Sequence, residues 1–128
     1  MEKGKIQVNQ KEMTQEEHGS ITYKTDFEAH ITLKDLHTDD AVKYLKRLLP
    51  DDVKQISEIK HYRKKNEVFY RTIFKIGYVI IDCQSGIASG YDGTGPTGFY
   101  EVLTQIVDKD IASIVYDRTY NNAVITIK

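Results

Sequence analysis

The segment from Gly90 to Gly98 combines residue types whose spacing suits the binding of an anion. It holds four of the eight glycines of the chain, in the order Gly-Tyr-Asp-Gly-Thr-Gly-Pro-Thr-Gly. An apolar, strand-like stretch precedes it, and a pattern typical of an amphipathic helix follows over residues 99–108. Glycines let the backbone approach a ligand closely, and the unpaired N–H groups at the start of a helix attract negative charge. We therefore expect an anion site formed by Gly93, Thr94, Gly95, Thr97, Gly98 and Phe99.

The same segment satisfies the spacing G-x-G-x-x-G between Gly93 and Gly98. In dinucleotide-binding proteins that fingerprint lies in a parallel βαβ unit, whereas a hairpin pattern follows here and Pro96 interrupts the motif. The P-loop for nucleoside triphosphates is excluded as well, because no Lys-Ser or Lys-Thr pair follows the last glycine. Two interpretations stay open: a generic anion site, or a tight turn whose helix is capped by Thr97 or by solvent.

A second candidate is the sequence His30-Ile31-Thr32. An apolar/polar alternation over residues 21–34 predicts a long half-buried strand, with His30 and Thr32 on its outer face. The motif H-x-T on a strand, followed by a helix, resembles the first half-motif of the 2H phosphoesterases, in which two such motifs hold a phosphate. The resemblance covers residues 30–49, and its second half is missing, since Val124-Ile125-Thr126 has valine in place of histidine. One histidine cannot act as both general acid and general base, so we expect a chance match or a binding cleft without turnover.

Cationic and aromatic residues alternate in two neighbouring stretches, residues 61–65 and 69–71. Such a pattern on a hairpin can hold a phosphate and stack a base, so Arg63 and Arg71 are candidate ligand-binding residues. The alternative is a solvated hairpin tip with ordinary surface charge. Arg118 lies in a turn-like segment with two asparagines and is a third candidate cation for a polar pocket.

Several classes of chemistry find no support in the sequence. The one cysteine, Cys83, ends an apolar strand and excludes an intramolecular disulfide, and the four histidines lack the spacing of metal ligands. We expect no metal and no cofactor. A formal net charge of −1 argues against a nucleic-acid partner. The sequence shows no signal peptide and no apolar run of membrane-spanning length, so we expect a cytoplasmic protein.

The elements that would position these residues follow from periodicity and from turn residues. The first helix is predicted from Thr38, as its N-cap, to Pro50, and the second over residues 99–108. Residues 11–20 are expected to form a polar loop and Gly77 a bulge. Strands are predicted at residues 6–8, 21–34, 53–63, 67–74 and 78–81, the last of them central, and in a terminal hairpin of residues 111–119 and 123–128. Together these elements predict one α+β domain over residues 1–128, a mostly antiparallel β-sheet with two amphipathic helices on one face, in the order ββ-α-ββ(β)-α-ββ.

The function that we expect is non-catalytic binding of a small anionic ligand, a nucleotide or a phosphorylated metabolite, which the protein would sense or sequester. Small binding proteins often form pockets between subunits, so we also expect a homo-oligomer. Two other classes stay open. One is a protein–protein interaction module, such as an inhibitor or immunity protein, that uses the sheet face. The other is a degenerate phosphodiesterase of the 2H type, the one alternative in which the protein would be an enzyme.

Overall fold

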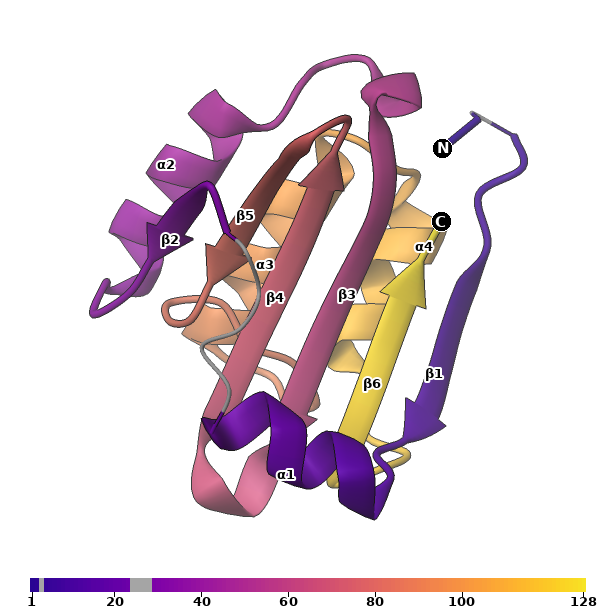
Figure 1. Ribbon diagram of the computed structural model, residues 1–128. Coiled ribbons are helices and arrows are strands. Elements are labelled where there is room, and N and C mark those ends of the chain that lie inside the picture. Colours follow the sequence, from indigo (N-terminus) through magenta and orange to yellow (C-terminus); the bar gives the residue numbers. More distant parts are fainter. Residues whose placement is uncertain (3, 24–28) are drawn as a thin grey trace.

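A computed structural model describes residues 1–2, 4–23 and 29–128 of the chain, and it has the predicted α+β architecture (Figure 1). Six strands form one sheet in the order β1-β6-β3-β4-β5-β2. All neighbouring strands are antiparallel except β2 and β5, which are parallel. The strands are β1 (Val8–Glu12), β2 (Ile31–Leu33), β3 (Ile56–Lys64), β4 (Phe69–Ile76), β5 (Val79–Cys83) and β6 (Asn122–Ile127).

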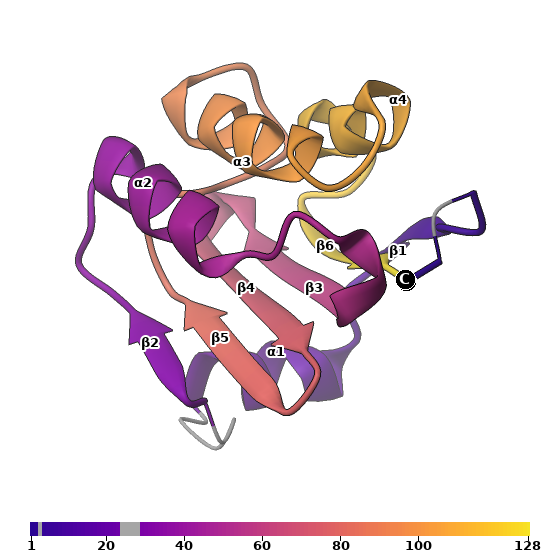
Figure 2. The same cartoon turned by 90° about the horizontal axis from the view of Figure 1, so that it is seen from above.

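Helices cover both faces of the sheet, but unequally (Figure 2). The α-helices are α1 (Gln15–Tyr23), α2 (Thr38–Leu48), α3 (Thr94–Thr104) and α4 (Lys109–Ala112), and short 3-10 helices are found at Val53–Gln55, Lys65–Glu67 and Ser113–Tyr116. Helices α2, α3 and α4 cover one face, and α1 crosses the other face at one end. None of the helices in the described part of the chain is long and apolar enough to cross a membrane.

The main core lies between the sheet and the layer of α2 and α3. Its fully buried members come from α2, α3 and the central strands and include Leu45, Ile59, Phe74, Phe99 and Ile125. A smaller cluster under α1 holds Met13, Ile21, Tyr62, Ile73 and Val124. Apolar side chains thus lie on both faces of the central strands, and their burial stabilises the packing of helices on each side of the sheet.

Helices α2 and α3 run parallel and side by side, so their N-termini lie at the same end of the molecule. Lys46 in α2 forms a 2.8 Å ion pair with Glu101 in α3. Closer to the N-termini of the two helices, Gly98 in α3 lies against Thr38 in α2. A Cβ atom on Gly98 would be 2.4 Å from Thr38 Cγ2 and 3.0 Å from Val42 Cγ2. The missing side chain of Gly98 is therefore what lets the two helices approach this closely.

We predict that Gly98→Ala lowers the free energy of unfolding by about 1–3 kcal/mol, because the added methyl group overlaps α2. Thr38→Ser removes the overlapping Cγ2 atom, so it should restore part of the loss in the double variant. Urea unfolding followed by circular dichroism would measure both. The matched control is Gly19→Ala in α1, where a Cβ meets nothing within 4 Å; it should be neutral or stabilising by about 0.5–1 kcal/mol. Equal effects of the two glycine replacements would contradict the packing role of Gly98.

The N-terminal third differs from the sequence-based prediction. Residues 15–23 form α1, so the loop predicted at 11–20 and the strand predicted from residue 21 are both wrong there; of that strand only Ile31–Leu33 is found, and residues 24–28 lie outside the described part. The reason is a capping box: Thr14 Oγ1 accepts a hydrogen bond from the Glu17 N–H, and a Glu17 carboxylate oxygen accepts one from the Thr14 N–H, both at 3.1 Å. The signal T-x-x-E was present in the sequence.

The predicted terminal hairpin is also wrong in its first half. Residues 109–116 form α4 and a 3-10 helix, because the buried Ala112 and Val115 are three residues apart and pack as one helical face. Strand β6 instead lies between β1 and β3, which are far from it in sequence.

Smaller differences concern the ends of elements and one turn. Gly77 is no bulge but part of the turn between β4 and β5, with a left-handed φ of +57°. Tyr78, predicted inside a central strand, is 97% exposed in that turn, and β5 lies one strand from the edge. Helix α3 begins at Thr94, inside the glycine-rich segment, and α2 has His37 rather than Thr38 at its N-cap. Strands β3 and β4 are confirmed close to their predicted places.

Candidate functional site

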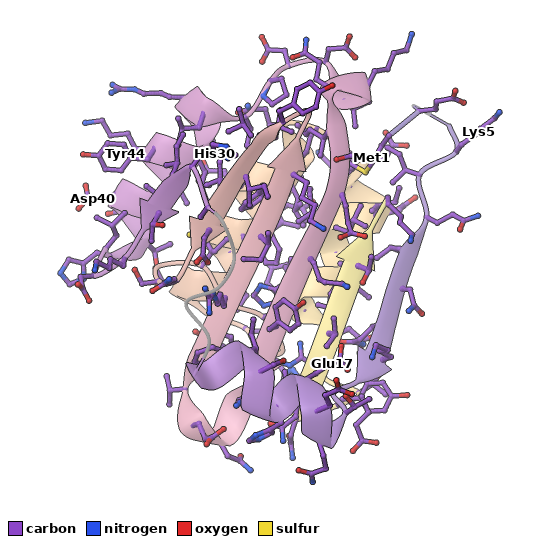
Figure 3. The ribbon with its side chains drawn as sticks, in the orientation of Figure 1. Met1, Lys5, Glu17, His30, Asp40 and Tyr44 are labelled. Atoms are coloured by element: carbon purple, nitrogen blue, oxygen red, sulfur yellow. The ribbon has the colours of Figure 1, made fainter. Side chains whose placement is uncertain are left out.

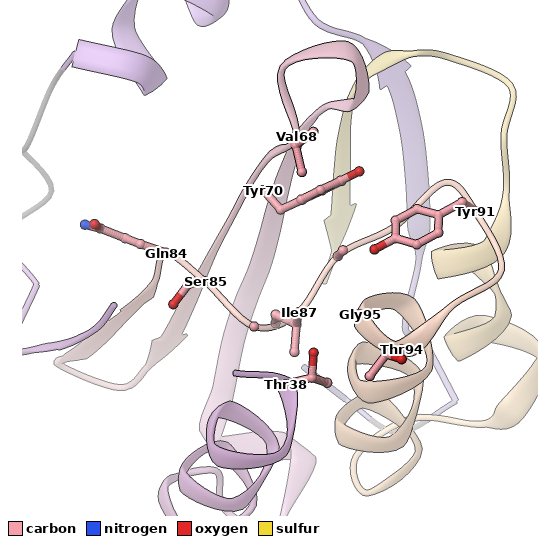
Figure 4. A pocket seen from close by; sticks show the side chains of 11 residues that line it. Thr38, Val68, Tyr70, Gln84, Ser85, Ile87, Tyr91, Thr94 and Gly95 are labelled. Carbon is pink, nitrogen blue, oxygen red and sulfur yellow. The ribbon is translucent and has the colours of Figure 1, made fainter. Parts of the chain in front are cut away.

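A cavity of about 550 Å³ lies where the connection between β5 and α3 meets the N-termini of α2 and α3 (Figure 4). Its volume falls in the range of roughly 300–1,000 Å³ that is usual for small-molecule sites. A neighbouring cavity of about 330 Å³ shares Thr38 and Thr94 with it. The larger cavity is lined by Thr38, Val68, Tyr70, Gln84, Ser85, Gly86, Ile87, Ala88, Tyr91, Thr94 and Gly95.

Two half-buried tyrosines form the aromatic part of the wall. The ring centroids of Tyr70 and Tyr91 are 6.2 Å apart with the planes tilted by 46°, and Tyr70 also stacks on the buried His61 at 6.3 Å. Burial raises the pKa of the Tyr70 hydroxyl, so the group stays neutral and can donate a hydrogen bond. Since stacked rings lie about 4.5–7 Å apart, no third ring fits between the two tyrosines. A planar ligand would stack on one of their outer faces.

The start of α3 provides the polar end of the cavity. Thr94 and Gly95 line it, Gly93 is the N-cap without a side-chain cap, and the first turn carries no acidic residue. Pro96 has no N–H, and the Thr97 N–H already bonds to the Gly93 carbonyl at 3.0 Å. The amides of Thr94 and Gly95 are therefore the donors that the first turn of this helix offers to a ligand.

Close packing explains why a glycine occupies position 95. A Cβ atom there would lie 2.8 Å from the Ala88 Cβ and 2.9 Å from the Tyr91 hydroxyl oxygen. The connection that precedes α3 thus folds back over the first turn of the helix, and the Tyr91 hydroxyl lies beside the helix start. Helix α2 contributes Thr38 to the same cavity but has Asp39 and Asp40 in its first turn, which already offset its dipole.

Uncharged groups make up the lining of the larger cavity among the described residues, with hydroxyl groups from Thr38, Ser85, Thr94 and the two tyrosines and an amide from Gln84. The electrostatic preference of the site therefore comes from the helix ends rather than from a lysine or arginine. Of the two ends, that of α3 has no acidic residue in its first turn, and Asp92 just before it is paired with Arg118, so the negatively charged part of a ligand is best placed there.

A buried polar cluster lies directly behind the wall of the cavity. His61 contacts Thr72 Oγ1 through Nδ1 at 2.7 Å and Ser89 Oγ through Nε2 at 2.8 Å, and Arg63 Nη1 donates to the same Ser89 oxygen at 2.9 Å. All four residues have essentially no exposed surface. Burial, aided by the positive charge of Arg63, lowers the pKa of His61 to about 3.

Ser89 and His61 are at the distance of a nucleophile and its base, but their surroundings do not suit catalysis. Ser89 is wholly buried and already accepts a hydrogen bond from a cation, and a base with a pKa of about 3 holds a proton too weakly near neutral pH. The cluster therefore acts as an internal hydrogen-bond network. Ser89 and His61 are 28 residues apart in the chain, and no local pattern in the sequence links them as partners.

The predicted anion-binding segment is divided by the structure. Thr94 and Gly95 line the cavity, and Gly93 precedes them as the N-cap. Thr97 is exposed on another side of α3, where its hydroxyl bonds to Tyr116 at 3.1 Å. The remaining two residues point inwards: Gly98 faces α2, and the Phe99 ring is fully buried in the core.

Of the H-x-T motif, Ile31 and Thr32 lie on the edge strand β2 and His30 directly precedes it (Figure 3), and none of the three lines the cavity. His30 is exposed at the start of β2, and its Nδ1 accepts a hydrogen bond from the Ile80 N–H at 3.2 Å. Thr32, also exposed, pairs in register with Asp82. The cavity begins beyond the opposite end of β5, at Gln84. The position that corresponds to the second half-motif, Val124, is buried in the cluster under α1.

The three candidate arginines are not brought together. Arg63 and Arg71 lie on opposite faces of the sheet, since Arg63 pairs in register with Tyr70 and Arg71 with Tyr62. Both are buried, and each is engaged in bonds inside the protein. Arg118 is exposed and forms a 2.7 Å ion pair with Asp92. Instead of these cations, the structure brings two tyrosines to the cavity, residues that sequence spacing alone could not place together.

The chain was compared with protein-family models, with curated proteins and with solved structures, and none of the three comparisons gave a match.

Proposed function

We propose that this protein binds a small ligand with a planar ring and an anionic group, of the nucleotide class, in the cavity between β4, the β5–α3 connection and the start of α3. The observation that carries the proposal is the cavity itself, about 550 Å³ in volume and walled by Tyr70 and Tyr91. The role is binding without turnover, as a sensor or a store for the ligand. It would be exerted in the cytoplasm.

The aromatic wall supports a ring-bearing ligand. Base stacking on an aromatic side chain contributes about 1–3 kcal/mol per base, and the two half-buried tyrosines offer such a surface together with two hydroxyl groups. Hydroxyl and amide side chains around them, from Thr38, Gln84 and Ser85, are suited to the polar edges of a base or a sugar.

The start of α3 supports an anionic group at the other end of the ligand. Backbone N–H groups of Thr94 and Gly95 provide two donors, and the helix dipole adds about 0.3–1 kcal/mol in favour of negative charge. The stacking and the helix-dipole contributions are each small. We therefore expect a ligand that carries both a ring and an anionic group to bind more tightly than either group alone.

Two measurements test the proposal. Native mass spectrometry of the purified protein reports any ligand that co-purifies and, at the same time, whether the chain forms the homo-oligomer that its size suggests. Calorimetry then compares 5′-AMP with adenosine and with inorganic phosphate. We expect AMP to bind more tightly than both fragments, without hydrolysis. Absence of binding by AMP and by any co-purified molecule would refute the proposed function.

Thr94→Glu should separate ligand binding from folding. The residue is exposed at the first position of α3, where an acidic side chain favours the helix, so stability should be unchanged or raised by about 0.3–1 kcal/mol. The new carboxylate repels the phosphate, so we expect at least a tenfold loss of AMP affinity by calorimetry. Thr94→Gln has nearly the same size without the charge and serves as the control. Similar affinities of the two variants would show that no anion binds at the start of α3.

A further inference from the structure

The connection from β5 to α3 forms the cavity wall, and one of its residues, Ser89, faces the opposite way. Residues 84–88 and Tyr91 line the cavity, whereas the Ser89 side chain is fully buried behind it. There its oxygen is joined to Arg63 Nη1 at 2.9 Å and to His61 Nε2 at 2.8 Å. Gly90 follows with a φ of +83°, and a Cβ on it would lie 2.8 Å from the Arg63 side chain. The backbone of the wall at Ser89 and Gly90 therefore packs directly on the Arg63 side chain.

The donors and acceptors in this cluster determine where the protons lie. An arginine can only donate, so Ser89 Oγ accepts from Arg63. Because the guanidinium is positively charged, the Ser89 hydroxyl proton points away from it towards His61 Nε2, which is then the unprotonated nitrogen of the neutral ring. The ring proton consequently lies on Nδ1 and is donated to Thr72 Oγ1, 2.7 Å away on β4. The other tautomer would place the ring proton on Nε2, the side of the ring nearer the positive charge of Arg63, which that charge disfavours.

The cluster is itself fixed at both ends by the sheet. Arg63 Nη2 donates to the Gln10 side chain at 3.0 Å and to the Tyr120 carbonyl at 2.6 Å, so β1 and the turn before β6 hold its far side. The His61 ring lies 4.7 Å from the Phe99 ring of α3 and stacks on Tyr70 of the cavity wall. Movement of the His61 ring would therefore disturb Ser89 and Tyr70 together.

We infer that the chain Arg63–Ser89–His61–Thr72, with His61 held as the Nδ1–H tautomer, positions the wall of the cavity, so that Ser89 and His61 are positioning residues of the ligand site although neither lines it. The consequence for ligand affinity rests on the proposed function. The tautomer and the rigidity of the wall do not, and they are measurable on the free protein.

Nitrogen NMR of the imidazole rings tests the first part on the wild-type protein, with the His61 signals assigned by their absence in His61→Gln. We expect a protonated Nδ1 and an unprotonated Nε2 for His61. A protonated Nε2 would overturn the inference. The tautomer is measured on the wild-type protein. The variant serves only to assign the His61 signals, and if it fails to fold, through-bond NMR experiments can assign them instead.

Amide hydrogen exchange tests the second part. The N–H groups of Ala88 and Gly90 are bonded to the carbonyls of Gly95 and Val115, so they should exchange slowly. In Ser89→Ala their exchange should accelerate about tenfold relative to the amides of β3, because the wall loses its buried anchor. Val124→Ala, which removes buried methyl groups on the opposite face, is the control and should accelerate the wall and β3 together. A Ser89→Ala protein in which the wall and β3 also change together would overturn the inference.

The binding consequence separates the two proposals. AMP affinity should fall about tenfold in Ser89→Ala and remain unchanged in Val124→Ala under conditions where both proteins are folded. If AMP does not bind the wild-type protein, the proposed function fails, and the tautomer and exchange measurements still decide the inference. If AMP binds the wild type and Ser89→Ala equally well, the positioning role of Ser89 is refuted while the proposed function stands.

Discussion

Asp82→Asn is expected to lower the free energy of unfolding by about 3–5 kcal/mol, one of the largest effects of any single replacement in this protein. Asp82 is 2% exposed, and its two oxygens accept hydrogen bonds from Arg71 Nε at 2.9 Å and Nη2 at 2.6 Å. The amide of the variant is neutral, so the buried guanidinium loses the negative charge that Asp82 provides. Urea unfolding at pH 7 would measure the loss.

The size of this effect depends on the surroundings of the ion pair. Arg71 Nη1 also donates to the Ile21 carbonyl of α1 at 3.0 Å, and Gln84 donates to Asp82 at 2.9 Å. The ion pair thus attaches α1 to the sheet. We expect α1 to unfold locally before the rest of the variant, with faster amide exchange in α1 than in α2 or α3.

Two controls distinguish the effect of removing the negative charge beside Arg71 from the effect of losing a hydrogen-bond contact. Glu101→Gln breaks an ion pair at the surface, in which the side chains of Lys46 and Glu101 are 40% and 55% exposed. It should therefore lower the free energy of unfolding by at most about 1 kcal/mol. Replacing both buried partners, as Arg71→Met with Asp82→Leu, removes the buried charge itself and should recover most of the stability. If the double variant is as unstable as Asp82→Asn, the bonds to Ile21 and Gln84, rather than the buried charge, explain the loss.

His61 should make the protein lose stability in mild acid. Its pKa is about 3 in the folded protein, against an ordinary value of 6.5, so the unfolded chain binds a proton that the folded chain rejects. The contribution of His61 to stability is therefore complete above pH 6.5 and decreases as the pH falls towards 3. The expected slope is about 1.4 kcal/mol per pH unit, with a total on the order of 5 kcal/mol.

Unfolding free energies measured between pH 6.5 and 4.5 isolate this residue from the carboxylates. The pKa values of Glu17 and Asp117 are lowered by their hydrogen bonds in the folded protein, so their contributions are lost at more acidic pH. In His61→Gln the amide can occupy the place of the ring without gaining a proton, and the slope in this window should largely disappear. The same slope in the wild type and in this variant would show that another group is responsible.

The sequence by itself determined the features that depend on neighbours along the chain. The 3.6-residue period of α2 and α3, the turn between β3 and β4 and the glycine-rich segment that opens a helix were all predicted, because their signals are local. The α+β class follows from the same signals. Even α1, which the prediction missed, has its cause in the local capping box of Thr14 and Glu17.

The tertiary structure decided which of the chemically capable residues meet. In the sequence, Arg63 and Arg71 resemble surface residues that could bind a phosphate. In the structure both are buried against partners distant in sequence, Ser89 of the β5–α3 connection and Asp82 of β5 respectively. Tyr70 and Tyr91 lie on different elements and come together because the β5–α3 connection folds back over the start of α3. A buried charge is tolerated only when a partner offsets the cost of its desolvation, and that partner is determined by strand order and register rather than by the residues beside it in the chain.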